Sequence, residues 1–232
     1  MTHRSFSLAS TASPDTNLLF HRETLRHDFF ALRHGQSLAN VAHLIASNPN
    51  VACDQYGLSA TGHEQAKAAG VDVVQTYEKC GYGGIAILSS DLLRARETAD
   101  AVRDAAEKAG LPIYGDCVVL ETSLRERGFG KWDLSSDSNY DTVWEADAMD
   151  SSHEVEGVES VDAVMKRATA CVSDWDATLP DSTTMMVVCV AHGDVLQILQ
   201  TAFEKKSGVL HRSVDHLETA KLRPLRMTVT KR

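Results

Sequence analysis

The stretch that decides the fold is Phe29-Phe30-Ala31-Leu32-Arg33-His34-Gly35-Gln36-Ser37. It begins as an apolar run of the kind found in a buried parallel strand, and it stops at an arginine, a histidine and a glycine. Ligands of open α/β sheets bind in the crevice at the carboxyl ends of the strands. A glycine directly after the histidine allows a sharp turn and a close approach of backbone to ligand. We therefore predict a ligand site at this junction.

A second apolar run near the other end of the chain stops in the same way. Residues 185–191 are all apolar, and His192, Gly193 and Asp194 follow them. Because parallel strands present their carboxyl ends at the same edge of a sheet, two such strands would bring their terminal histidines together. The sequence predicts that His34 and His192 share one site.

Apolar runs of strand length alternate with helical periodicity along the chain. The predicted strands include residues 85–88 and 118–120, one or two edge strands are expected after His216, and the predicted helices cover 61–77, 91–109, 161–175 and 195–203. Thr61 and Glu64 have the spacing of a capping box at the start of the first helix. This alternation predicts an α/β fold, a three-layer α/β/α sandwich with a mostly parallel central sheet.

One domain is expected, with a polar extension before it and one insertion within it. Residues 1–27 lack hydrophobic periodicity and are predicted to be a flexible N-terminal extension. Residues 28–232 are predicted to form a single domain. Residues 133–159 are polar and acidic, and we expect them to form a lid-like insertion with a short helix.

The amino-acid composition of the chain limits the classes of partner that it can bind. The formal net charge of -9 over 232 residues argues against nucleic acid and anionic membranes as partners. No stretch approaches the ~20 apolar residues of a membrane-spanning helix. The five cysteines have no zinc-site spacing and favour a reducing compartment, the cytoplasm, although three arginines among residues 1–27 leave organellar targeting open. The oligomeric state is not determined by the sequence.

Two further segments carry residues capable of chemistry. Arg94 lies in the first turn of a predicted helix, where free N–H groups and the helix dipole favour anions. Arg96 lies about 200° further round that helix at ~100° per residue, so we expect it to be solvated. Glu126 lies in a loop whose glycines and aromatic residues indicate a defined shape, although a surface ion pair is the simpler alternative. A lone strand-end histidine is also often structural. Together, two histidines, two arginines and one carboxylate are the groups needed for phosphoryl transfer through a covalent histidine.

The ordered set of motifs resembles that of the histidine phosphatase superfamily, the phosphoglycerate mutase-like proteins. The motifs are Arg-His-Gly after the first strand, Ser-x-Asp-x-x-Arg-Ala-x-x-Thr-Ala at a helix start, Leu-x-Glu-x-x-x-Gly in a loop, and a late His-Gly; they occur at His34, Arg94, Glu126 and His192. The resemblance covers roughly residues 29–200 and implies a phosphoglycerate mutase-like fold. Val158 departs from the family's usual Gly-Gly-Glu-Ser segment.

The resemblance also implies roles for individual residues. His34 would become a phosphohistidine, and Glu126 would be the general acid and base. The phosphoryl oxygens would be held by Arg33, Asn40, Arg94, His192 and Gly193. The scheme requires no metal and no other cofactor, because cationic side chains take the part that magnesium plays in other phosphotransferases.

These roles predict a metal-independent phosphomonoester hydrolase that acts on a small phosphorylated substrate. The alternative is a cofactor-dependent phosphoglycerate mutase, and a non-catalytic phospho-ligand-binding protein is a further one. Residues 132–160 contain no Lys or Arg and nine acidic side chains, so this segment is a poor cover for the polyanionic substrate of a mutase. In addition, Phe129 stands where the mutases usually have tyrosine. Hydrolysis is therefore favoured over isomerisation. Metal ligation by His34 and His192 is disfavoured, because adjacent arginines repel cations.

Overall fold

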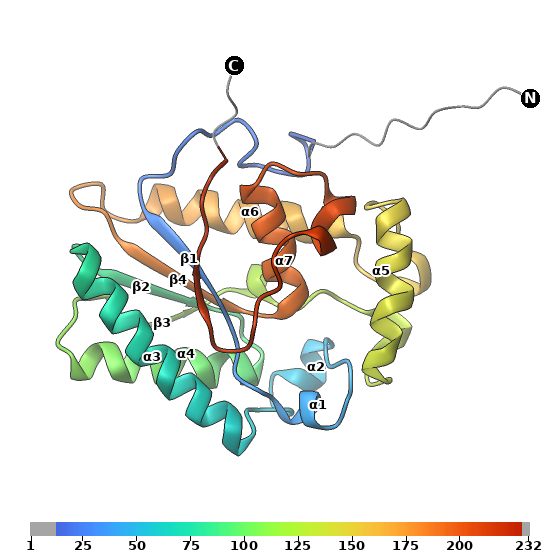
Figure 1. Ribbon diagram of the computed structural model, residues 1–232, viewed down its shortest axis with the longest axis horizontal. Helices are drawn as coiled ribbons and strands as arrows, with labels where there is room; N and C mark the ends of the chain where they lie inside the picture. The colour runs from blue at the N-terminus through green and yellow to red at the C-terminus, as the bar shows by residue number, and fades with distance from the viewer. Residues whose placement is uncertain (1–12, 229–232) are drawn as a thin grey trace, which may run out of the picture.

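A five-stranded sheet forms the centre of the protein (Figure 1). The structure is a computed structural model that describes residues 13–228. The strand order is β3-β2-β4-β1-β5. The strands are β1 (Asp28–Arg33), β2 (Ile85–Ser89), β3 (Ile113–Leu120), β4 (Met186–Ala191) and β5 (Leu222–Pro224). The first four are mutually parallel and β5 runs antiparallel to β1, which confirms the predicted mostly parallel sheet.

Helices cover both faces of the sheet and complete the three predicted layers (Figure 1). One face is covered by α3 (Ala60–Cys80) and α4 (Leu93–Lys108), and the other by α6 (Val161–Thr178) and α7 (Gly193–Phe203). Strand side chains alternate between the layers: Phe29 packs toward α6 and α7, whereas Phe30 packs toward α3 and α4. A strand covered on both faces has no solvent side, which explains the uninterrupted apolar runs.

Shorter helices gather beyond the end of the sheet to which β1 leads (Figure 1). They are α1 (Leu38–Val41), α2 (Pro49–Ala52) and α5 (Tyr140–Met149), and α5 is the short helix expected between residues 133 and 159. Single 3-10 turns occupy Thr122–Leu124, Gly130–Trp132, Asp137–Asn139 and Val155–Gly157, and a longer one Gly208–Ser213. A small apolar cluster of Ile45, Phe129, Val143 and Val158 ties these segments together. Val158, the departure from the family pattern, is a buried member of this cluster.

The described part of the N-terminal segment is packed against the domain, which corrects the prediction of a flexible extension reaching residue 27. Leu19 is fully buried in the core beside α6 and α7. The Asn17 amide donates to the Ala202 carbonyl oxygen at 2.8 Å, and Arg22 forms an ion pair with Asp176 at 3.2 Å. The sequence signal is weak because a few long-range contacts, not a periodic face, hold this segment. Residues 1–12 lie outside the described residues.

Helix α3 begins two residues earlier than its predicted capping box. Ser59 is the N-cap, and its hydroxyl accepts from the Gly62 N–H at 3.1 Å, whereas Glu64 forms an exposed ion pair with Lys67. Gly62 fixes this start, because a Cβ there would lie 2.0 Å from the Gln36 carbonyl oxygen. The helix start therefore packs directly against the loop that carries the strand-end histidine.

Strand β3 is longer than the predicted residues 118–120. It runs from Ile113 to Leu120, with a register shift opposite Ile85 and Ile87 of β2. Gly115 and Asp116 have positive φ angles of 67° and 53° in the irregular part. An edge strand interrupted in this way loses the period of two that reveals strands in a sequence.

Two further observations concern the cysteines and the hydrophobicity of the helices. All five cysteines are free thiols, and Cys171 and Cys189 are buried in the core. No helix between residues 13 and 228 is both long and apolar enough to cross a membrane.

The packing of the N-terminal segment predicts a difference between two neighbouring leucines. Leu19→Ala should lower the free energy of unfolding by about 2 to 5 kcal/mol, because it leaves a cavity in the core. Leu18, which is 43% exposed, is the matched control, and Leu18→Ala should change the free energy by no more than about 0.5 kcal/mol. Denaturant unfolding measures both. Equal, small effects would mean that this segment does not belong to the folded core.

Candidate active site

The two strand-end histidines lie side by side, as the sequence predicts. Strands β1 and β4 are hydrogen-bonded neighbours, with Arg33 in register with Ala191, and the His34 N–H donates to the Ala191 carbonyl oxygen at 3.0 Å. The imidazole rings of His34 and His192 are 5.2 Å apart between centroids at an angle of 60°. Both side chains are buried.

The contacts of His34 fix its tautomer. The Arg94 Nε–H points at His34 Nε2 at 3.1 Å, and a guanidinium can only donate. Nε2 therefore carries the lone pair, and Nδ1–H donates to the Gly35 carbonyl oxygen at 2.7 Å. Burial, together with the charges of Arg94 and Arg33, holds the pKa of His34 well below its usual range. His34 is thus a neutral imidazole at neutral pH, with an unprotonated nitrogen facing the site.

His192 is held by a serine that the sequence analysis did not single out. Its Nε2 lies 2.8 Å from the hydroxyl of Ser90, the residue directly after β2. Burial lowers the pKa of His192 well below the ordinary value, and the charge of Arg94 lowers it further. The Nδ1 atom is buried and has no hydrogen-bond partner among the described residues. The position of Ser90 at a strand end was the available signal.

Arg94 and Arg33 bring two positive charges to the histidines, and neither pairs with a carboxylate in the part of the chain that the structure describes. The Nη2 of Arg94, in the first turn of α4, donates to the Ala46 carbonyl oxygen at 2.9 Å, and the Nη1 of Arg33 donates to the Leu217 carbonyl oxygen at 3.2 Å. Arg94 Nη1 and Arg33 Nε are buried, and neither has a hydrogen-bond partner among residues 13–228. Desolvated guanidinium groups with free N–H bonds form a site for an anion.

Asn40 and Gly193 complete the predicted set. The Asn40 side-chain oxygen accepts from both the N–H and the hydroxyl of Ser37 at 3.0 Å, which leaves its NH2 group as the free end. Gly193 begins α7 directly after His192, and the Arg33 guanidinium lies against it. A Cβ at position 193 would come within 3.3 Å of Arg33 Cζ, so glycine is what allows this close approach.

Glu126 is a half-buried residue of the loop after the Thr122–Leu124 turn, and its carboxyl group lies against the start of α7. Its Oε1 accepts from the Arg127 N–H at 3.0 Å and from the Val195 N–H at 3.4 Å. Burial raises the pKa of Glu126, and the nearby Asp194 carboxylate raises it further. The group therefore keeps its proton to a higher pH than an exposed glutamate, which is the state that a general acid requires.

A cavity of about 190 Å³ opens beside Glu126. Of the predicted site residues, Arg33, Asn40, Glu126 and Gly193 line it, whereas His34, Arg94 and His192 are buried and do not. The remaining lining residues were not predicted as site residues: Leu44, Asp137, Tyr140, Trp144, Asp194, Gln197, Arg212 and His216. They come from the loop after α1, the turn Asp137–Asn139, α5, α7 and the segment before β5, and no local motif marks them.

A buried ion network fixes α5 beside this cavity. Arg127 is fully buried and forms two hydrogen bonds to Asp147 of α5 at 2.6 and 2.7 Å. Its Nη1 also lies 3.3 Å from Asp194 of α7. The network was not predicted, because its members are separated by 20 and 67 residues.

Three other histidines lie outside the lining of this cavity. His63 is exposed on α3, whereas His153 and His211 lie 2.7 and 3.6 Å from Asp147 in the buried network. Arg96 is half-buried and donates to the Cys53 carbonyl oxygen at 2.6 Å, so the prediction that it is solvated was wrong. Across the described residues, no group of three or more His, Cys, Asp or Glu side chains lies so that it could hold a metal ion.

The profile of the histidine phosphatase superfamily (branch 1) matches residues 29–230 of this chain. No curated protein matches it significantly.

Several solved structures have the same fold. The mycobacterial glucosyl-3-phosphoglycerate phosphatase Rv2419c, in complex with VO3, is 27% identical with a TM-score of 0.67, and the match covers 85% of this chain and 92% of that one. The same protein with inorganic phosphate gives 26% identity, a TM-score of 0.65 and coverages of 85% and 88%. A putative alpha-ribazole-5'-P phosphatase from Escherichia coli is 18% identical with a TM-score of 0.60, covers 85% and 89%, and shows the fold alone.

The buried network predicts a large effect of Arg127 on stability. Arg127→Leu should lower the free energy of unfolding by about 3 to 5 kcal/mol, because it leaves Asp147 as a buried charge without its main partner. Arg125, which pairs with Asp91 at a half-exposed position, is the control, and Arg125→Leu should cost no more than about 1 kcal/mol. Denaturant unfolding compares the two. Similar losses for both variants would contradict the structural importance of the Arg127 network.

Proposed function

The chain belongs to branch 1 of the histidine phosphatase superfamily, and on this premise we propose that it hydrolyses a phosphomonoester through a phosphohistidine on His34, without a metal ion. The observation that carries the proposal is the unprotonated His34 Nε2 beside two arginines that pair with no carboxylate of residues 13–228. An anion placed between these arginines would lie in front of the nucleophilic nitrogen. The similar mycobacterial phosphatase, solved with VO3 and with inorganic phosphate, supports the assignment of a phosphate pocket.

In the first step, the lone pair of His34 Nε2 attacks phosphorus and forms the N–P bond. The P–O bond to the alcohol breaks, its electron pair stays on the alcohol oxygen, and Glu126 supplies the proton. The guanidinium groups of Arg33 and Arg94 stabilise the charge that spreads over the phosphoryl oxygens. The Asn40 amide, the Gly193 N–H and His192 would supply the remaining donors.

In the second step, water replaces the alcohol. The Glu126 carboxylate takes a proton from this water as its oxygen attacks phosphorus. The N–P bond breaks, its electron pair returns to His34 Nε2, and inorganic phosphate leaves. Both proton transfers therefore use one buried carboxyl group whose raised pKa suits a general acid.

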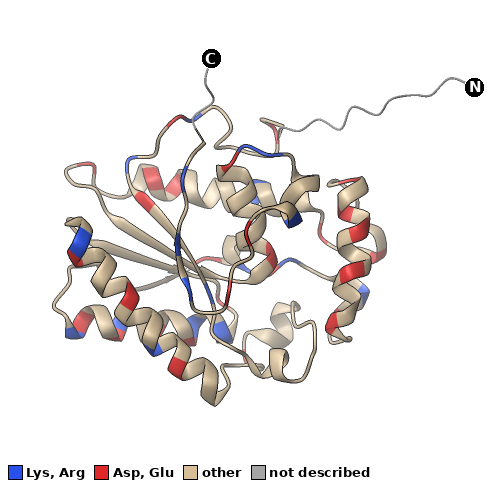
Figure 2. Ribbon diagram, viewed as in Figure 1, with Lys and Arg blue, Asp and Glu red and all other residues tan. Residues whose placement is uncertain are grey.

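The surroundings of the site favour hydrolysis over the phosphoglycerate mutase reaction. A mutase must retain a bisphosphorylated intermediate, which calls for a second cationic pocket. Figure 2 shows acidic and no basic side chains on α5, the helix beside the cavity. Asp137 and Asp194 add carboxylates to the cavity wall itself. A protein that only binds phospho-ligands would not need the paired nucleophile and acid.

The covalent step predicts a specific intermediate. After mixing with p-nitrophenyl phosphate and rapid quenching, mass spectrometry should find a base-stable, acid-labile phosphate on His34. His34→Ala should lower turnover by more than about a thousandfold, because no other group can take the phosphoryl. His63→Ala, at an exposed histidine of α3, is the control and should leave turnover unchanged, as should a chelator. A phosphate on another residue would overturn the proposal.

The acid role of Glu126 predicts a dependence on the leaving group. Glu126→Gln should lower kcat/KM, which reports the steps up to release of the alcohol, by about 10² to 10⁴-fold for an alkyl phosphate and much less for p-nitrophenyl phosphate, because nitrophenolate leaves without a proton. In the unaltered protein, turnover of the alkyl ester should fall as the pH rises through the raised pKa of Glu126, since the donor proton is then lost. Glu126→Gln should not show this decrease in turnover with rising pH. Equal losses for both esters would argue against the acid role.

A further inference from the structure

The leaving group must lie in the cavity beside Glu126. Because Glu126 protonates the leaving oxygen, the alcohol of the substrate has to be within hydrogen-bond reach of this carboxyl group. Glu126 lines the 190 Å³ cavity together with Arg33 and Asn40. The chemistry of this cavity wall therefore selects the alcohol.

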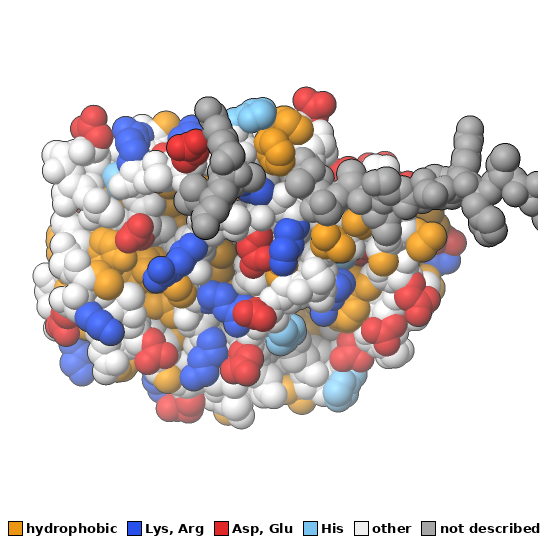
Figure 3. Space-filling view, turned by 45° about the horizontal axis from the view of Figure 1, so that its top comes forward, with side chains coloured by type: hydrophobic (Ala, Val, Ile, Leu, Met, Phe, Trp, Pro, Cys, Tyr) orange, Lys and Arg blue, Asp and Glu red, His pale blue; other side chains and the backbone are white. Residues whose placement is uncertain are grey.

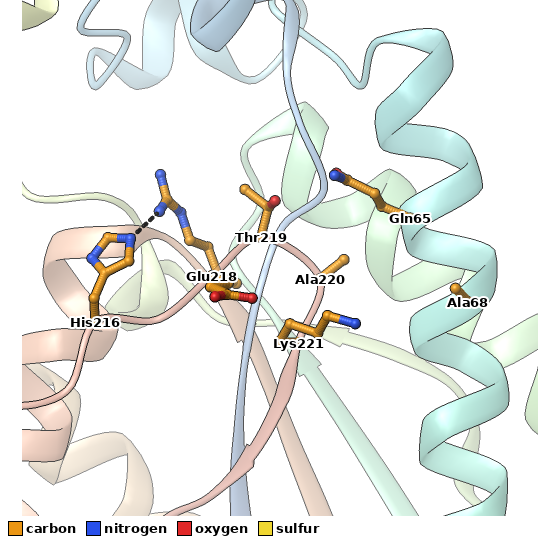
Figure 4. Close-up of a pocket in the computed structure, with 8 residues that line it drawn as sticks. Gln65, Ala68, His216, Glu218, Thr219, Ala220 and Lys221 are labelled. Carbon is orange, nitrogen blue, oxygen red and sulfur yellow. Dashed lines mark hydrogen bonds between the residues drawn. The ribbon is translucent and has the colours of Figure 1, made fainter.

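A second hollow, of about 500 Å³, also has Arg33 in its lining, and Figure 4 draws the residues that line it. Figure 4 shows Gln65 of α3 facing Thr219 and Lys221 of the segment before β5. Arg33 and His216 line both hollows, and Arg33 Nη1 lies 3.4 Å from His216 Nε2. Glu126 does not line the second hollow, so Lys221 is not placed to meet the leaving group.

The positive charge of Arg212 at the cavity wall is already balanced. Its Nη1 donates to Gln197 Oε1 at 2.6 Å and lies 3.6 Å from Asp194 Oδ1. Its guanidinium stacks over the Trp144 ring at 3.7 Å, and the Trp144 indole N–H donates to the same Asp194 oxygen at 3.1 Å. Tyr140 stacks on Trp144 with an interplanar angle of 6°. Arg212 is thus fixed as the partner of a buried carboxylate.

Among residues 13–228, a charge count over the site leaves two arginines without a carboxylate partner. Arg127 and Arg212 are matched by Asp147 and Asp194. Among the cavity-lining residues, Asp137 adds a further carboxylate, whose near partner is the exposed His43 at 3.0 Å. The side chains on the surface shown in Figure 3 are likewise of mixed sign, with basic groups interspersed among acidic ones.

Arg33 and Arg94 remain, and their two charges match the two charges of one phosphoryl group. We propose that the substrate is a phosphomonoester of an uncharged, hydroxyl-bearing alcohol, and that Asp137, which no arginine among residues 13–228 pairs with, excludes a second anionic group from the leaving-group cavity. The oxygens of this carboxylate accept hydrogen bonds from hydroxyl groups but repel a carboxylate or a second phosphate. This inference rests on the proposed hydrolase function, which it extends to the leaving group.

The test compares esters that differ in one charge. Glycerol 3-phosphate and 3-phosphoglycerate share a carbon skeleton, and one has a CH2OH group where the other has a carboxylate. A second pair is 4-carbamoylphenyl phosphate and 4-carboxyphenyl phosphate, so that the comparison is available for aryl esters too. In each pair, kcat/KM should be at least about tenfold higher for the uncharged leaving group. The measurement with 3-phosphoglycerate is repeated with 2,3-bisphosphoglycerate, which should produce no 2-phosphoglycerate.

Two variants test whether the cavity wall is responsible. Asp137→Asn removes a carboxylate that lines the cavity. It should reduce the ratio of kcat/KM for the uncharged ester to kcat/KM for the charged ester about threefold or more. Glu145→Gln removes a carboxylate from the exposed side of α5, outside the cavity lining, and should leave the preference unchanged. If both variants reduce this ratio equally, the preference arises from the electrostatic field of the whole protein and not from the cavity wall.

The possible failures are distinguishable. If p-nitrophenyl phosphate is not hydrolysed, the proposed hydrolase function fails. If it is hydrolysed but the charged member of either pair is the better substrate, the hydrolase stands and the inference about the leaving group is overturned. Formation of 2-phosphoglycerate would overturn the inference as well, because that reaction requires the cavity to hold a second anionic group.

Discussion

The parallel pairing of β1 with β4 is the interaction on which the site depends. It aligns Arg33 with Ala191, so that His34 and His192, which follow these residues, emerge together at one edge of the sheet. A slip by one residue would turn every side chain of a strand to the opposite layer, and burial on both faces opposes this slip. The apolar packing of the strands thus positions polar groups that contribute nothing to the core.

The arrangement of positive charges in the site is electrostatically unfavourable. Among the described residues, the buried Arg94 and the half-buried Arg33 have no carboxylate partner, and their charges suppress protonation of two buried histidines. Such an arrangement is costly in free energy and is expected at a functional site, where an anionic ligand would relieve it. By contrast, the neighbouring Arg127 is fully matched by Asp147 and Asp194. The unpaired Arg33 and Arg94 are available to an anionic ligand, whereas the paired Arg127 stabilises the structure around the site.

The difference between the two sets bears on specificity. Residues of the first set belong to short local motifs, whereas most of the cavity wall is assembled from α5, α7 and the segment before β5. Trp144 and Arg212 are 68 residues apart, yet they stack and share Asp194 as a partner. The cavity proposed for the leaving group is therefore built from contacts between distant segments.

The sequence by itself determined the layers, the parallel sheet, and the convergence of His34, Arg94 and His192, because strand-end motifs and helical periodicity are local signals. It misplaced the start of α3, where Gly62 packs against Gln36, and it shortened β3, whose irregular part lacks a period of two. It treated residues 1–27 as loose, although contacts such as that of Asn17 with Ala202 hold the described part of this segment. Only the tertiary structure decided which arginines are neutralised and which remain free. Neutralisation depends on distances between residues far apart in the chain, and spacing in a sequence does not encode these distances.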